Sequence, residues 1–225
     1  MIYFGLDLGQ AQDYTALTAV EKKLIPTNIV HDYLEVMKDV KVDGGNKEYH
    51  LRHVERFALG TTYPEIVTKL MDRITAVNLG EQYMVIVDAT GVGRPVVDLM
   101  RKNNIRCTPV SFTGGEHEAF DPDFGGWRVP KRILVSNLQV LFQNQQLRMA
   151  TNLPHIEVLT KELLNLKVKI TQARNETYEA WREGEHDDLV FSLAMAAWYA
   201  VRFGITEQED KQPVEQSPWL KVKGL

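Results

Sequence analysis

Aspartates occur at three places in this chain where carboxylates are uncommon. Asp7 lies inside the apolar segment Ile2–Leu8, although strands contain little Asp and burial of an unpaired charge is costly. Asp88 ends a second apolar run, and Asp187 and Asp188 immediately precede a long apolar segment. Something must offset the cost of these charges, and a bound cation is one such compensation.

Carboxylates that converge repel one another, so they stay ionised together only if cations neutralise them. Hard oxygen ligands favour Mg²⁺ or Mn²⁺. Two such ions can activate a water molecule and stabilise the leaving oxygen of a phosphodiester. We therefore predict a site for two Mg²⁺ or Mn²⁺ ions with Asp7, Asp88 and Asp188 as catalytic metal ligands and Asp187 beside them.

Each acid also has a purely structural explanation. Asp7 could begin a turn before Gly9, Asp88 could simply end its strand, and the Asp187–Asp188 pair could cap a helix. The combination of all of them favours the metal site.

Two further polar residues are candidates for supporting roles. His186 could orient a scissile phosphate or a water molecule, or be a solvated residue beside a helix start. Asp13 is expected to cap the turn into the second strand.

Positive charge is local rather than global. Lys plus Arg total 26 against 30 for Asp plus Glu, giving a net charge of −4, so any nucleic-acid binding must use patches. Most basic residues are expected to be solvated surface. The candidates for phosphate contacts are Arg128, Lys131, Arg132, Lys167, Lys169 and Arg174.

The first half of the chain predicts the sheet that must hold the acids. Ile2–Leu8 is apolar on both faces, as in a central strand, and we expect 15–20 and 29–36 to form an antiparallel meander with it. His53–Ala58 is expected to rejoin this sheet. Further along, 83–87 predicts a parallel strand.

Helices and further strands follow from periodicity and turn residues. Helices are expected from Tyr63 to Val77 and over 96–102, 130–145 and 154–165, with strands over 105–112 and 147–149 and a loop over 114–126. Segments 166–171 and 177–181 flank a polar turn and predict a hairpin. His186–Phe203 is apolar nearly all round and predicts a buried final helix.

These elements predict an α/β protein with a ribonuclease H-like fold: a central mixed sheet of three antiparallel strands followed by parallel strands, flanked by helices, with a β-hairpin before the last helix. We expect one nuclease domain over residues 1–205 and a mobile polar tail over 206–225.

Three segments resemble the nuclease motifs of phage terminase large subunits. Gly5-Leu6-Asp7-Leu8-Gly9 resembles the first, and Val87-Asp88-Ala89-Thr90-Gly91-Val92-Gly93 the second. Glu183-Gly184-Glu185-His186-Asp187-Asp188-Leu189-Val190 is similar to the third.

The resemblance implies a ribonuclease H-like fold, a two-metal endonuclease and double-stranded viral DNA as substrate during genome packaging. Carried over, Asp7, Asp88 and one of Asp187 and Asp188 are the metal ligands, with Asp188 favoured. It also implies an ATPase motor domain, a small terminase and a portal protein as partners. The match begins at residue 2 and the sequence has no P-loop motif, so we expect either an excised domain or a stand-alone relative.

Other functions remain open. Asp7-Leu8-Gly9 and the glycines after Asp88 also resemble the phosphate loops of actin-like ATP-binding enzymes, which need two similar domains. A resolvase or transposase-like nuclease would share the fold, and a catalytically silent packaging module would lack metal-dependent DNA nicking.

Composition argues against a disordered, a disulfide-stabilised and a membrane-spanning protein. With 225 residues, 44% of them hydrophobic, the chain can bury a substantial core, which excludes disorder as the main state. The single cysteine, Cys107, cannot form an internal disulfide. No membrane span or secretion signal is expected, so we predict a cytoplasmic protein, in the host cell if it is viral.

Overall fold

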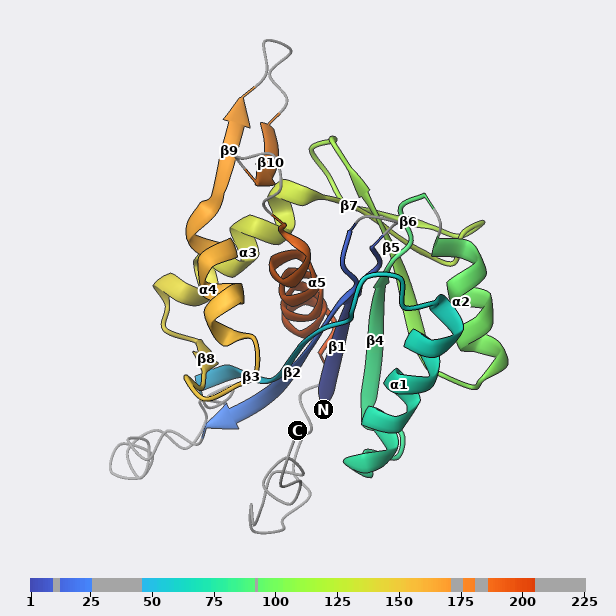
Figure 1. Cartoon of the computed structure of the whole chain (residues 1–225). Helices are drawn as coiled ribbons and strands as arrows, with labels where there is room; N and C mark the ends of the chain where they lie inside the picture. Colours follow the sequence, from blue (N-terminus) through green and yellow to red (C-terminus); the bar gives the residue numbers. More distant parts are fainter. Residues whose placement is uncertain (10–12, 26–45, 92, 171–175, 181–185, 205–225) are drawn as a thin grey trace, which may run out of the picture.

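One large mixed sheet forms the centre of the molecule (Figure 1). The computed structural model describes residues 1–9, 13–25, 46–91, 93–170, 176–180 and 186–204. The sheet has eight strands in the order β6-β7-β5-β4-β1-β2-β3-β8. Their bounds are β1 Ile2–Asp7, β2 Ala16–Ile25, β3 Asn46–Arg56, β4 Tyr83–Asp88, β5 Cys107–Thr113, β6 Ala119–Asp121, β7 Gly126–Pro130 and β8 Leu147–Met149.

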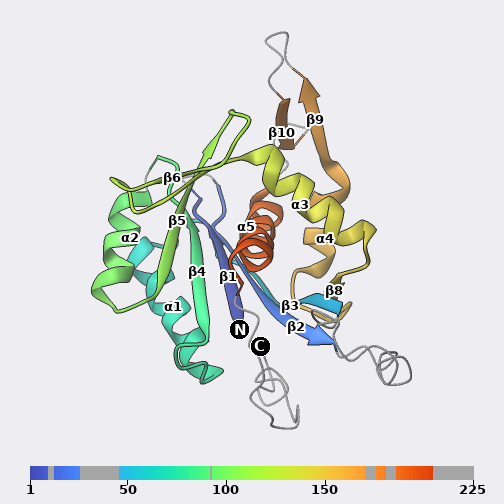
Figure 2. The ribbon, with the colours of Figure 1, turned by 180° about the vertical axis from the view of Figure 1, so that it is seen from behind.

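Helices cover both faces of this sheet (Figures 1 and 2). The two faces carry separate hydrophobic cores, one with α1 and α2 and the other with α3, α4 and α5. The helices are α1 Tyr63–Ala76, α2 Gly93–Lys102, α3 Lys131–Gln143, α4 Ile156–Asn165 and α5 Asp188–Arg202. Among the described residues, no helix combines the length and the apolar character needed to cross a membrane.

The central strand β1 sends its side chains alternately into the two cores. Ile2, Phe4 and Leu6 lie in the core with α1 and α2, whereas Tyr3 lies in the core with α5. The same period of two directs Asp7 to the α5 side.

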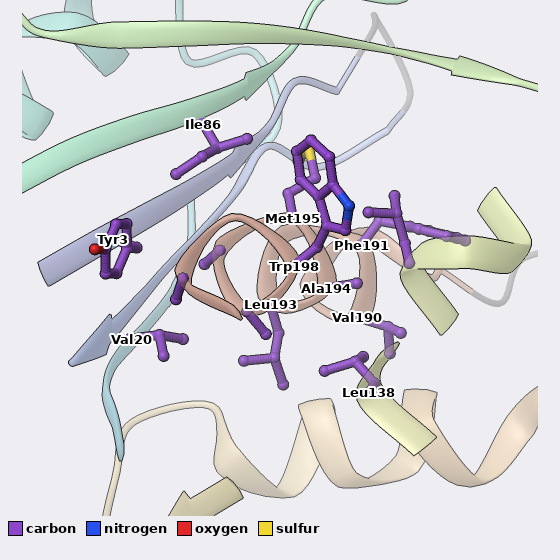
Figure 3. Close-up of a cluster of buried hydrophobic side chains, with 14 of the residues drawn as sticks. Tyr3, Val20, Ile86, Leu138, Val190, Phe191, Leu193, Ala194, Met195 and Trp198 are labelled. Carbon is purple, nitrogen blue, oxygen red and sulfur yellow. The ribbon is translucent and has the colours of Figure 1, made fainter. Parts of the chain in front are cut away.

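Helix α5 lies in the middle of its core. Side chains on nearly every side of it are buried, including Leu193, Met195 and Trp198 (Figure 3). Val20 and Ile86 reach it from the sheet and Leu138 from α3. A helix that is apolar all round can exist in water only when it is enclosed in this way, which confirms the predicted buried helix.

The β-hairpin before the last helix is also confirmed. β9 Leu166–Ile170 pairs antiparallel with β10 Glu176–Ala180 as a separate two-stranded sheet. β9 begins directly where α4 ends, so α4 and the hairpin form one continuous arm beside α5 (Figure 2).

Two expectations about the sheet need correction. The third antiparallel strand is β3, which begins at Asn46 and is longer than the predicted 53–58 segment; the predicted strand over 29–36 lies outside the described residues. Part of the predicted loop over 114–126 forms β6, which pairs with β7 at the edge of the sheet. A three-residue strand is too short to show alternation, and only the pairing reveals it.

The residues from 205 onward lie outside the described part of the chain, so the domain boundary at 205 and the mobile tail remain predictions.

Candidate metal centre

The parallel pairing of β1 and β4 brings two of the predicted acids together. Leu6 lies opposite Val87, so the next residues, Asp7 and Asp88, end the two strands side by side. Ile86 belongs to the α5-side core, so Asp88, two residues later, points to the same side as Asp7. Both acids therefore meet α5 at the carboxyl edge of the parallel strands, where open α/β sheets bind their ligands.

A glycine allows α5 to approach these acids closely. A Cβ atom on Gly5 would lie 1.8 Å from the backbone oxygen of Ser192, so no other residue fits without moving the helix. The Ser192 hydroxyl donates to the carbonyl oxygen of Gly5 at 2.8 Å and hydrogen-bonds to Thr18 Oγ1 at 2.9 Å. This contact fixes the helix against β1, and it brings the first turn of α5, with Asp188, to the end of that strand.

The electrostatics show that the acids share one environment. Burial raises the pKa of Asp7 well above its ordinary value, and the charges of Asp88, Asp188 and Asp187 raise it further, whereas Lys131 lowers it. Burial also raises the pKa of Asp88, although Thr90, Lys131 and a hydrogen bond with Asp7 lower it.

Asp188 is held at the start of α5 by polar neighbours. Burial raises its pKa to about 6, Arg56 and His186 lower it, and Asp187 and Asp13 raise it. His186 Nδ1 lies 3.7 Å from Asp188 Oδ2, and its ring packs edge-on against Tyr14. Both predicted supporting residues, His186 and Asp13, are thus close enough to influence Asp188. Asp13 is exposed and lines a cavity of about 360 Å³ beside the N-terminus of α1.

The donor set fits a hard divalent cation. Asp188 Oδ2 is buried and has no hydrogen-bond partner within the described ranges, which is a costly state for a carboxylate oxygen. A cation would satisfy that oxygen and remove the repulsion that raises the pKa values of the neighbouring aspartates. Across the described residues, no three His, Cys, Asp or Glu side chains are already arranged as a complete metal site, so ion binding would have to draw the carboxylates together.

Of the predicted basic residues, Lys131 is one whose charge reaches the acids. Lys131 begins α3, and its Nζ atom lies 4.3 Å from the centre of the Phe191 ring. It lowers the pKa of both Asp7 and Asp88, so its charge acts directly on the candidate site.

The other predicted basic residues are placed differently. Arg128 pairs with Asp121 at 3.0 Å, and Arg132 donates to the Glu116 carbonyl oxygen at 2.9 Å. Lys167 and Lys169 lie on β9, with side chains outside the described part. Arg174 also lies outside the described residues.

Two charged residues at the site were not predicted from the sequence: Glu162 on α4 and Arg56 at the end of β3. Glu162 is 7% exposed, accepts hydrogen bonds from the first turn of α5, and pairs with Arg56. One indication was available: Glu162 lies three residues after Leu159, so it falls on the buried face of an amphipathic helix. Arg56 gave no such indication, because its partners lie on other elements.

Comparison with known proteins gave matches only among solved structures. No protein-family model matches the chain, and no curated protein matches it. The large terminase nuclease from thermophilic phage G20c, solved with bound magnesium, matches with a TM-score of 0.58 and 22% identity over 88% of this chain and 80% of that one. The human cytomegalovirus terminase nuclease domain, soaked with Mn, matches with a TM-score of 0.53 and 14% identity over 90% of this chain and 84% of that one.

A third match shows the same fold within a longer protein. The HK97 bacteriophage large terminase has a TM-score of 0.51 and 18% identity, covering 88% of this chain but 39% of that one. At these identities the likeness establishes the fold: this chain has the mixed α/β, ribonuclease H-like architecture of large terminase nuclease domains.

Proposed function

We propose that this chain, which has the fold of large terminase nuclease domains, is a divalent-metal-dependent endonuclease that cleaves double-stranded DNA during viral genome packaging. The observation that carries the proposal is the meeting of Asp7, Asp88 and Asp188 at one edge of the sheet, with raised pKa values at all three positions. A cluster of buried, mutually repelling carboxylates destabilises a folded protein unless a bound cation neutralises their charge, and such clusters are typical of functional sites.

In this proposal Asp7, Asp88 and Asp188 hold two Mg²⁺ or Mn²⁺ ions, with Asp187 as an additional carboxylate. When bound, such ions activate water and stabilise the charge that develops on a phosphodiester in hydrolysis. The solved neighbours with bound magnesium, cobalt or zinc, or soaked with Mn, support the use of a divalent metal here.

The chain's own residues contribute positioning. Asp88 Oδ1 accepts the backbone N–H of Thr90 at 2.8 Å, which orients that carboxylate at the end of β4. The Lys131 ammonium lies on the same side of the sheet as the acids, where it would attract a DNA phosphate. His186, beside Asp188, is placed to hydrogen-bond a phosphate oxygen or a water molecule.

DNA binding is proposed to use local positive charge rather than the whole surface. Among the predicted phosphate-contact residues, Lys131 is the one whose charge acts on Asp7 and Asp88. Arg128 and Arg132 are near it in sequence, and Lys167, Lys169 and Arg174 belong to the hairpin segment of the sequence. Phosphate contacts supply most of the affinity in binding that does not depend on sequence, so we expect cleavage with little sequence preference.

By analogy with the large terminase of HK97, in which the matched region is 39% of the chain, we propose that the nuclease works with an ATPase motor domain, a small terminase and a portal protein. The proposed location is the cytoplasm of an infected host cell.

The direct test is plasmid relaxation combined with calorimetric titration of Mn²⁺. We expect nicking of supercoiled DNA in Mn²⁺, none in EDTA, and binding of two Mn²⁺ ions per chain. Cleavage that persists in EDTA would exclude the metal mechanism. Mn²⁺ binding without any nicking would instead identify a catalytically silent packaging module.

A further inference from the structure

Helix α5 begins with an unusual arrangement, because its first backbone N–H groups are capped from another helix. Glu162 Oε2 accepts the N–H of Leu189 at 3.0 Å and that of Val190 at 3.2 Å. Asp187, at the N-cap position, makes no capping hydrogen bond with its side chain. The orientation of the first turn of α5, and with it the position of Asp188, therefore depends on a residue of α4.

The second oxygen of Glu162 binds Arg56. The Arg56 Nη2 group donates to Glu162 Oε1, while the same nitrogen stays 3.8 Å from Asp188 Oδ2. The guanidinium lies over the Tyr14 ring, 4.8 Å from its centre. Arg56 is thus held by Glu162 and Tyr14, close to Asp188 but without a hydrogen bond to it.

This arrangement has a consequence for the metal ligand. A buried carboxylate next to an arginine normally forms a short, charge-assisted hydrogen bond with it. Asp188 does not, since its Oδ2 atom has no hydrogen-bond partner in the part of the chain that the structure describes. Glu162 takes the Nη2 donor that would otherwise form a short hydrogen bond with Asp188, so Arg56 acts on Asp188 only as a longer ion pair at 3.8 Å.

We propose that Glu162 is a positioning residue that keeps Asp188 available for a divalent cation, by capping the first turn of α5 and by holding Arg56 away from the Asp188 carboxylate. The inference rests on the proposed metal site and adds Glu162 and Arg56 to it. Neither residue is proposed to touch the metal or the DNA.

The test is a Mn²⁺ titration by calorimetry in the absence of DNA, with circular dichroism to verify folding. Glu162→Gln keeps the size of the side chain but removes the charge that holds Arg56, which can then pair with Asp188. We expect Mn²⁺ affinity to fall at least tenfold. The matched control is Glu157→Gln, a change of the same kind at an exposed position of the same helix, which should leave affinity unchanged.

A second variant separates this role from simple helix capping. In the double variant Glu162→Gln/Arg56→Gln the competing cation is gone, so Mn²⁺ affinity should recover to within about threefold of wild type. A role in stability alone predicts no recovery, because the double variant lacks both partners. The proposal is overturned if folded Glu162→Gln binds Mn²⁺ within twofold of wild type, or if the double variant binds no better than the single one.

Two further outcomes are informative. If Glu162→Gln does not fold, Glu162→Asp replaces it, since it keeps the charge but shortens the reach to Arg56; a loss of at least threefold is expected, and an unchanged affinity overturns the proposal. A wild-type chain that binds no Mn²⁺ overturns the proposed metal site and this inference together, whereas normal wild-type binding with an unaffected Glu162→Gln overturns the inference alone.

Discussion

The two ends of α5 differ in how their polar groups are satisfied. At the C-terminal end, Glu118 accepts the Trp198 indole N–H at 2.8 Å and pairs with Arg202 at 2.5 Å, and the Trp127, Trp198 and Phe203 rings pack together. At the N-terminal end, Asp188 has an unsatisfied buried oxygen and a raised pKa.

Helix α5 thus has a well-packed C-terminal end, whose polar groups are paired, and an N-terminal end at which a buried carboxylate oxygen lacks a hydrogen bond. The aromatic packing and the Gly5 contact secure α5, and their stabilisation offsets the cost of crowding carboxylates at its start. Such concentration of unfavourable charge at one place is typical of a functional site rather than of a structural one.

The largest effect is expected at the N-terminal end from Asp88→Asn. Loss of one metal ligand should lower the rate of plasmid nicking in Mn²⁺ at least about a thousandfold, equivalent to about 4 kcal/mol of barrier. Without metal, thermal stability should stay equal or rise, because Asp88 is buried and its charge repels that of Asp7. Asp72→Asn, a neutralisation at an exposed position of α1, is the control and should change neither quantity.

Next in size is the effect of Gly5→Ala, which disturbs the contact of β1 with α5 at Ser192. The new methyl group would lie 1.8 Å from the Ser192 backbone oxygen, so α5 must move away from β1. We expect a loss of about 1 to 3 kcal/mol in the free energy of unfolding, measured in urea, together with weaker Mn²⁺ binding. Gly114→Ala, at a glycine with open space around it, should be neutral. Equal stability of the two variants would contradict the close approach.

The free energy of unfolding should depend on pH through Asp188, at the N-terminal end of α5. Burial raises the pKa of Asp188 to about 6, above the ordinary value of about 4. The folded chain then holds this proton more tightly than the unfolded chain, so the stabilising contribution is present at low pH and lost as the pH rises from about 4 to about 6.

The measurement is urea unfolding in EDTA, with Asp188→Asn as the reference. The free energy of unfolding of the wild type should fall relative to this variant by about 1 to 3 kcal/mol across that pH range. A constant difference would show that Asp188 is not perturbed. Mn²⁺ should oppose the fall, because the cation favours the ionised carboxylates.

The smallest effect is expected at the C-terminal end from Glu118→Gln. The amide oxygen can still accept the Trp198 N–H, and only the charge opposite the half-exposed Arg202 is lost. We expect a stability loss of at most about 1 kcal/mol and nicking within twofold of wild type. A large loss of nicking would show that the two ends are not separable.

Much of this fold could be predicted from the sequence. The apolar run Ile2–Leu8, the strand that ends at Asp88, the hairpin and the buried final helix were all anticipated from periodicity and turn residues. Neither β6 nor β7 was anticipated, since pairing defines both strands: β6 with β7, and β7 with β5. The full length of β3 was missed: Tyr49 and Leu51 alternate with half-exposed residues, but a register shift in the pairing with β2 interrupts this alternation before Val54.

The sequence by itself determined which acids stand at the ends of apolar runs, because the length of such a run is a local property. Since Ile2–Leu8 is apolar on both faces, the face to which Asp7 points followed only from the packing of its neighbours in the two cores. Only the tertiary structure decided that α5 packs tightly enough on Gly5 to bring Asp188 to the sheet edge where Asp7 and Asp88 lie. Only the tertiary structure, too, placed Glu162 and Arg56, which are 106 residues apart in the sequence, in one ion pair beside Asp188. Contacts of that kind depend on how whole elements pack, and no local pattern of residues records them.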